Sequence, residues 1–205
     1  MNTLEKVKII KKALNYYFPH PKPFLHAKNP YTLLIAVLLS AQCTDDRINA
    51  LTPALFKKAF NPKQMLKLSQ TELEKLIYGA GFYHNKAKAI LGLSKVLVDK
   101  YKGKIPSNFE DLESLPGVGH KTASVVMSQV FKKPAFAVDT HVFRLARRWK
   151  LSASDNVKKV EEDLKKLFRP SSWRKIHLQI VSFGKKYCTA KKHSNTECPI
   201  CSKIL

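Results

Sequence analysis

The sequence predicts an all-α protein, and three observations support that prediction. Apolar residues recur at helical spacing in nearly every segment, whereas strict alternation over the length of a strand is hard to find. Capping residues and glycines mark where the helical segments begin and end. The chain has 205 residues and 44% apolar content, enough to fill one good-sized core or two small ones. We therefore expect a helical protein that folds without help.

The first expected helices are limited by prolines. An initial helix should stop at the prolines from Pro19 onward, and its apolar face is formed by Leu4, Val7, Ile10, Leu14 and Tyr17. A second helix should follow from residue 30 to about residue 41. Its apolar run is far too short to span a membrane, so we expect this helix to be buried in the core. An apparent helix over residues 45–60 contains Pro53, which should kink or divide it.

Capping boxes predict two further helix starts. Ser69 with Glu72, and Ser107 with Glu110, have the spacing at which side chain and backbone satisfy each other at a helix start. Glycines at 79 and 81 should end the helix that begins near Ser69. The remaining helices are expected over 85–101, closed by a glycine at 103, and over 121–130, 140–150, 156–168 and 173–187.

The charge of the chain indicates a nucleic-acid partner. Lys and Arg number 37 against 15 Asp and Glu, which gives a formal net charge of +22. Such a charge attracts polyanions, and its dispersal along the chain predicts a folded basic surface in place of a disordered tail. A ribosomal protein would have the same charge. The four cysteines, without a signal peptide, favour a reducing compartment, so we expect a cytoplasmic protein.

The most informative segment is LPGVGHKTA, residues 115–123, which predicts a short turn between two helices. Gly117 and Gly119 allow a tight turn that leaves backbone N–H groups exposed at a helix start, and this geometry binds a phosphate without reading bases. An isolated Gly-x-Gly would more often be an ordinary connection. Lys121 follows in the first helical turn, where the helix dipole disfavours a positive charge and so favours a nucleophilic amine.

An acid occupies the start of a later helix, in VDTHVFR at residues 138–144. Asp139 has the position of an N-cap, whose side chain accepts a backbone N–H. A capping carboxylate can also be a catalytic group.

The pairing of LPGVGHKTA with VDTHVFR resembles the helix-hairpin-helix DNA glycosylases, most closely the endonuclease III family. LLSAQCTD around Gln42 and GAGFYHNKA around Phe82 extend the likeness through most of the chain. In that family the lysine after the hairpin is the nucleophile and the aspartate is its essential partner. The resemblance therefore implies these roles for Lys121 and Asp139.

The resemblance also implies an architecture and a reaction. Two helical lobes would flank a DNA-binding cleft: a central barrel with the hairpin at 23–133, and a second lobe of 1–22 plus 134–205 that carries Asp139 and the C-terminal cysteines. The enzyme would be a monomeric glycosylase and lyase that removes oxidised pyrimidines from double-stranded DNA in the bacterial cytoplasm and cleaves 3′ to abasic sites. The DNA-binding residues would be Gln42, Phe82, Leu115, Gly117, Val118, Gly119 and His141.

Two alternatives remain at this stage. The adenine glycosylases of the same superfamily generally lack a lysine after the hairpin and carry a further C-terminal domain. A non-enzymatic nucleic-acid-binding protein would share the charge and the hairpin, and only Lys121 with Asp139 argues against it.

Cys188, Cys198 and Cys201 lie where endonuclease III relatives usually hold a [4Fe-4S] cluster. The family spacing is Cys-x6-Cys-x2-Cys-x5-Cys, whereas this chain has Cys-x9-Cys-x2-Cys, so the fourth thiolate is missing and a normal cluster is not supported. His193 as a substitute ligand, His193 as an exposed loop residue, and zinc on the same three cysteines stay open. Cys43, beside Gln42, is a poor candidate for a ligand.

Overall fold

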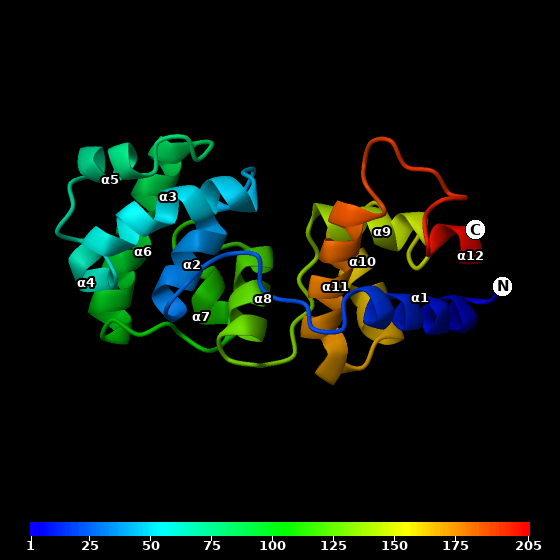
Figure 1. The fold of residues 1–205 in the computed structure, drawn as a ribbon. Coiled ribbons are helices and arrows are strands. Elements are labelled where there is room, and N and C mark those ends of the chain that lie inside the picture. Colours follow the sequence, from blue (N-terminus) through cyan, green and yellow to red (C-terminus); the bar gives the residue numbers. More distant parts are fainter. The chain divides into compact units, whose positions relative to one another are not determined.

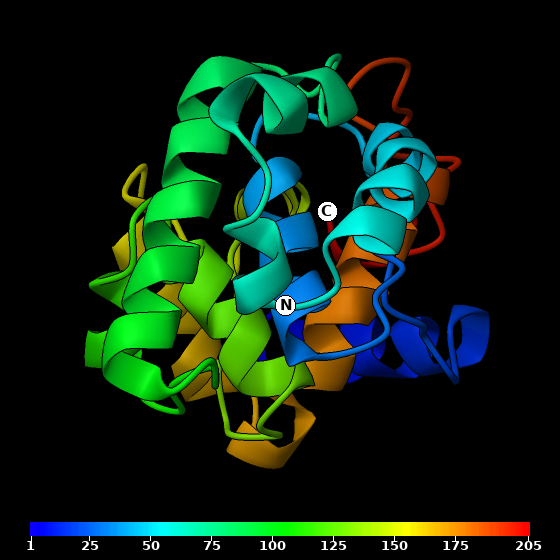
Figure 2. The ribbon, with the colours of Figure 1, turned by 90° about the vertical axis from the view of Figure 1, so that its left-hand side faces the viewer.

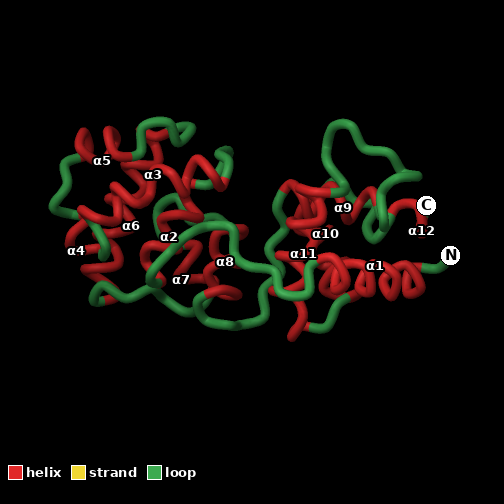
Figure 3. Tube along the Cα trace, viewed as in Figure 1, coloured by secondary structure: helices red, strands yellow, loops and turns green.

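A computed structural model describes all 205 residues and consists of α-helices, one short 3₁₀ helix and loops, without a β-strand (Figure 3). The all-α prediction is confirmed. None of the helices is both long and apolar enough to cross a membrane. Contacts divide the chain into two compact units, unit 1 with residues 1–23 and 133–205 and unit 2 with residues 24–132. The resemblance had placed this boundary at residues 23 and 133.

Unit 2 is built around one buried helix, α2. Its helices are α2 (Pro30–Leu39), α3 (Asp45–Lys58), α4 (Pro62–Met65), α5 (Gln70–Leu76), α6 (Tyr83–Tyr101), α7 (Phe109–Glu113) and α8 (His120–Gln129). Every residue of α2 from Tyr31 to Leu39 is buried, and α2 contacts α3, α6 and α8. Figure 2 shows α2 (blue) between α6 (green) and α3 (cyan). A fully buried Leu or Ile contributes about 1.5–3 kcal/mol, so α2 is the centre of this core.

The capping predictions met with mixed results. The box formed by Ser69 and Glu72 is present at the start of α5. The predicted start at Ser107 is wrong by one residue, because Asn108 caps α7. The Asn108 side chain accepts the Asp111 N–H at 2.8 Å and donates to the Asp111 carboxylate at 2.8 Å. Asn caps a helix as well as Ser does, so sequence spacing alone did not separate the two.

Other helix limits differ from expectation by small amounts. Pro53 lies inside α3 without dividing it. Helix α6 begins at Tyr83, two residues earlier than predicted, and the four-residue helix α4 was not predicted.

Unit 1 packs around α11. Its helices are α1 (Thr3–Tyr17), α9 (Thr140–Arg148), α10 (Val157–Leu167), η1 (Pro170–Ser172), α11 (Trp173–Lys186) and α12 (Cys201–Ile204) (Figure 1). Helix α11 contacts both α1 and α9, and its buried Phe183 lies 5.9 Å from the buried ring of Trp149. The predicted apolar face of α1 is correct for Val7, Ile10 and Leu14, but Leu4 is 68% exposed because the core does not reach the first helical turn.

Candidate active site

The turn between α7 and α8 requires glycine at position 117. Gly117 has a φ of +75°, and a Cβ built there would lie 2.7 Å from the Cβ of Ala89 and 3.1 Å from Cδ1 of Leu38. Any other residue would therefore be both strained and in collision with the core. Leu115 and Val118 are only 2% and 5% exposed. These two predicted binding residues can therefore offer a ligand little besides their backbone groups.

The start of α8 is held rigidly against α7. Gly119 is the N-cap of α8 and supplies no side-chain cap, so the positive end of the helix is not covered by its own capping residue. His120 Nδ1 lies 2.7 Å from the Glu113 carboxylate, and its ring stacks on Phe109 with centroids 5.4 Å apart. Lys121, the second residue of α8, is exposed. The Lys121 amine is therefore exposed in the first turn of α8, directly after the glycine turn.

Two loops of unit 2 place predicted DNA-contacting residues in an unusual backbone conformation. Gln42, between α2 and α3, has a φ of +55°, and Phe82, which precedes α6, has a φ of +59°. Both are exposed, and Phe82 retains 66% of its accessible surface. A bulky residue with positive φ costs on the order of 1–3 kcal/mol, and such strain concentrates at functional sites. The surrounding structure must hold these loops in place.

The two loops lie against each other, and hydrogen bonds from two cationic side chains to backbone carbonyl oxygens hold them. A Cβ built on Gly81 would lie 3.5 Å from the Gln42 carbonyl oxygen. The buried Lys86 donates from Nζ to the carbonyl oxygens of Leu39 at 2.8 Å and Ala41 at 2.7 Å. Arg47 Nε likewise donates to the Gly79 carbonyl at 2.8 Å. We define these residues, 39–42 and 79–82 with Arg47 and Lys86, as the paired loops.

Sequence reasoning missed Lys86 and Arg47. Lys86 is only 7% exposed, and burial lowers its pKa. A signal was present, because Lys86 shares a helical stripe with Ile90, Leu93 and Leu97, all of which are buried. A lysine on an apolar stripe indicates a buried donor that has found carbonyl partners.

Asp139 is held by its own helix. It is the N-cap of α9, and its Oδ1 accepts the Val142 N–H at 2.8 Å, so the predicted capping role is confirmed. The preceding residues 135–138 are buried, and His177 Nδ1 lies 2.8 Å from the Ala137 carbonyl oxygen. His141 follows on α9, with Nδ1 3.3 Å from Nη2 of Arg144. Asp139 belongs to unit 1 and Lys121 to unit 2.

The C-terminal cysteines form a cluster with one histidine. Cys188, Cys198 and Cys201 are buried, and a ring nitrogen of the half-buried His193 joins them, with all four donor atoms within 4.8 Å of one another. No disulfide links them. Hydrogen bonds from Cys201 and from Arg148 lower the pKa of Cys188. The cluster is compatible with a metal site, and it places His193 beside the three cysteines that the sequence had indicated.

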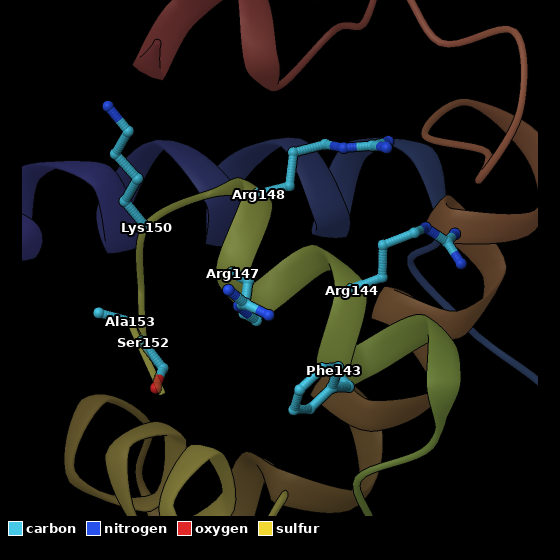
Figure 4. A pocket seen from close by; sticks show the side chains of 7 residues that line it. All are labelled: Phe143, Arg144, Arg147, Arg148, Lys150, Ser152 and Ala153. Atoms are coloured by element: carbon cyan, nitrogen blue, oxygen red, sulfur yellow. The ribbon is translucent and has the colours of Figure 1, made fainter. Parts of the chain in front are cut away.

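A basic hollow of about 730 Å³ lies beside this cluster, on α9. It is lined by Phe143, Arg144, Arg147, Arg148, Lys150, Ser152 and Ala153. Figure 4 shows Arg144 and Arg148 extending from α9 to the same side, toward α11. Arg144 donates to the carbonyl oxygens of Gly184 and Cys188, and Arg148 donates to that of Thr189. These arginines therefore join α9 to the end of α11.

The sequence and the structure are similar to known DNA-repair proteins. A family model described as HhH-GPD superfamily base excision DNA repair protein matches residues 35–170. Endonuclease III of Bacillus subtilis (strain 168) is 39% identical, covering 98% of this chain and 93% of the relative. Endonuclease III of Escherichia coli (strain K12) is 37% identical, covering 98% and 94%.

Solved structures give the same result. A trapped endonuclease III–DNA covalent intermediate superposes with a TM-score of 0.93 at 39% identity, covering 98% of this chain and 94% of that chain. A non-covalent endonuclease III–DNA complex gives a TM-score of 0.94 at 39% identity, covering 98% and 95%. A thermostable thymine-DNA glycosylase gives 0.87 at 25% identity, covering 98% and 96%.

Proposed function

Because this chain belongs to the endonuclease III family of the HhH-GPD superfamily of base excision DNA repair proteins, we propose that it is a bifunctional DNA glycosylase and AP lyase. Its substrates are oxidised pyrimidines and abasic sites in double-stranded DNA, and it acts as a monomer on the bacterial chromosome in the cytoplasm. The observation that carries the proposal is Lys121, an exposed amine directly after the rigid glycine turn, in a chain similar to an endonuclease III trapped covalently on DNA.

The chemistry begins with extrusion of the damaged nucleotide, because its glycosidic bond is hidden in the base stack. The paired loops are suited to fill the resulting gap. Phe82 presents an exposed aromatic wedge and Gln42 an exposed amide, and both stand on strained backbone that their neighbours hold. The amides of the glycine turn, at the positive end of α8, hold a phosphate of the strand and fix its position.

Lys121 then acts as the nucleophile. The neutral amine attacks C1′ of the extruded deoxyribose, and the glycosidic bond breaks with its electron pair leaving on the base, which is protonated. Asp139 stabilises the positive charge that develops on the sugar and assists proton transfers. Opening of the sugar ring gives a protonated imine, which acidifies the C2′ proton. Loss of that proton breaks the C3′–O bond and releases the 3′ phosphate, and water finally hydrolyses the imine and frees Lys121.

A cleavage panel tests this proposal. Duplexes with thymine glycol, dihydrouracil, an abasic site or 8-oxoguanine are incubated with the protein, and strand scission is compared with binding. We expect scission of the first three and little scission of 8-oxoguanine duplexes. Binding of every duplex without scission would identify a non-enzymatic nucleic-acid-binding protein. Release of adenine opposite 8-oxoguanine, without scission, would identify an adenine-type glycosylase.

Lys86 should be a positioning residue for the inserted amide. We expect Lys86→Met to lower the free energy of unfolding by about 2 kcal/mol, because two carbonyl oxygens lose a charged donor. Without the hydrogen bonds from Lys86, the loop that carries Gln42 should no longer be held in place, and the variant should lose part of its preference for damaged DNA. The measurement is the ratio of Kd for undamaged duplex to Kd for abasic duplex. This ratio should fall about tenfold, which corresponds to the loss of one hydrogen bond to a charged group.

Lys88→Met is the matched control for Lys86→Met. Lys88 lies on the same helix and carries the same charge, but it is exposed. The Lys88→Met substitution should therefore weaken binding to both duplexes equally and leave the ratio of the two Kd values unchanged. An unchanged ratio in Lys86→Met as well would mean that Lys86 serves stability alone.

A further inference from the structure

Four metal-binding side chains converge near the C-terminus of unit 1. Cys188 follows the end of α11, and Cys201 is the first residue of α12. His193 and Cys198 lie on the loop between these two helices. The four donor atoms lie within 4.8 Å of one another, and Sγ of Cys188 is 3.9 Å from Sγ of Cys201. A single point between them is thus surrounded by three sulfurs and one nitrogen.

These residues do not fit the [4Fe-4S] cluster that the family resemblance implies. Such a cluster usually takes four thiolates, one on each iron, whereas the donors gathered here are three thiols and one imidazole. The spacing is a second obstacle. Donor atoms within 4.8 Å of one another leave no room for four irons and four sulfides among them. The disagreement therefore lies in both the kind of donor and the distances between donors.

A single tetrahedral Zn²⁺ fits both the kinds of donor and the distances between them. With Zn–S bonds of about 2.3 Å, neighbouring sulfurs around a tetrahedral zinc lie about 3.8 Å apart. The Cys188–Cys201 distance of 3.9 Å agrees with this value. Cys198 and Cys201 are separated by two residues, and Cys188 and His193 by four, spacings typical of zinc-binding segments. Three cysteines with one histidine are also a common ligand set for structural zinc.

His193 provides an independent observation. Its Nε2 is buried and has no hydrogen-bond partner. An unsatisfied buried polar atom costs about 1–3 kcal/mol, so a structure keeps one only where something else satisfies it. Cysteines alone can be buried as small apolar residues, which would explain the three thiols. That explanation does not account for an unpartnered, buried imidazole nitrogen on the histidine that lies beside them.

The surroundings balance the charge of such a site. Three thiolates around Zn²⁺ leave one negative charge, and Nη1 of Arg148 lies 3.2 Å from Sγ of Cys188. A cation that donates to a ligating sulfur both neutralises the site and orients the ligand. Arg148 also donates to the Thr189 carbonyl at 2.9 Å, so the same side chain fixes the backbone that follows Cys188.

We propose that Cys188, His193, Cys198 and Cys201 form a structural Zn²⁺ site in place of an iron-sulfur cluster. All four positions of the tetrahedron are filled by the protein, which leaves none for a substrate and excludes a catalytic role for the ion. The ion fastens the irregular segment 189–200 between α11 and α12. Through Arg144 and Arg148 it also supports α9, the helix that Asp139 caps.

The metal content of the purified protein tests the proposal directly. The protein is produced in bacterial cells supplied with both iron and zinc, and its metals are measured by elemental mass spectrometry. We expect one zinc per chain and no visible absorption. Replacement of the zinc by Co²⁺ should give the visible bands of tetrahedral, thiolate-bound cobalt. Four irons with acid-labile sulfide would overturn the proposal, as would a metal-free protein that gives no cobalt bands.

Substitutions of His193 test the ligand set without touching the buried thiols. Loss of a residue that merely supports a ligand costs roughly 10–100-fold in metal affinity, so loss of a ligand in His193→Asn should cost at least about 100-fold. His193→Cys should retain zinc because a thiolate replaces the imidazole. His20→Asn, at an exposed histidine, is the matched control and should bind zinc normally. Unchanged affinity in His193→Asn would remove His193 from the site.

Metal content and strand scission are separate measurements. The proposed reaction at Lys121 uses no metal, so a protein that cleaves abasic DNA but contains iron would contradict the zinc site alone. A protein that contains one zinc but cleaves nothing would contradict the proposed function alone.

Discussion

Replacing Lys121 with glutamine is expected to abolish covalent trapping of the protein on DNA. Borohydride reduces the imine between the amine and the abasic sugar, and an amide side chain cannot form that imine. Wild-type protein should give a stable protein–DNA adduct on an abasic duplex, and Lys121→Gln should give none. Strand scission should fall by at least roughly 10³-fold, since removal of a nucleophile costs most of the catalytic power. The measurement is denaturing electrophoresis of labelled duplex after borohydride treatment.

The loss of covalent trapping expected for Lys121→Gln can be distinguished from unfolding of the protein and from the loss of one positive charge. Lys121 is exposed in the first turn of α8, where glutamine is a good helix former, so unfolding should be unaffected. Lys104→Gln removes the same charge from another exposed position of unit 2 and should still be trapped. Undiminished trapping of Lys121→Gln would show that another amine is the nucleophile and would remove the assignment.

The fold was predictable because its helices are locally encoded. The apolar spacing of Val7, Ile10 and Leu14 and the continuous apolar run of α2 each report which face is buried, and the structure buries them. Helix limits were less certain where two adjacent residues could both cap, as at Ser107 and Asn108. The four-residue helices α4 and α12 are too short to show a period, so no pattern could predict them.

Parts of the candidate site depend on contacts between residues far apart in sequence. Lys86 meets the carbonyl oxygens of Leu39 and Ala41, which precede it by 47 and 45 residues. A sequence pattern can show that Lys86 is buried but cannot name those partners. His193 is a similar case, because sequence spacing left open whether it meets the cysteines or solvent, and the loop geometry decides. The strained φ of Gln42 and Phe82 has no sequence signature at all, since neither residue is glycine.

Replacing Asp139 with asparagine should separate catalysis from both DNA binding and stability. Asparagine is as good an N-cap as aspartate, so the hydrogen bond from the Val142 N–H and the fold of α9 should persist. The charge that stabilises the developing positive charge on the sugar is lost. We expect single-turnover base release to fall about 10²–10⁴-fold, the range typical for a group that assists proton transfer, with Kd for damaged duplex nearly unchanged.

Asp139→Ala completes the comparison, because it removes the charge and the cap together. Its activity should fall as far as that of Asp139→Asn, but it should also lose about 1 kcal/mol of stability, seen as a decrease in Tm of roughly 2–4 °C. Equal stability of the two variants would mean that the capping bond contributes nothing. Near wild-type turnover in Asp139→Asn would restrict Asp139 to its capping role, because an amide keeps the geometry of the carboxylate and lacks only its charge and its basicity.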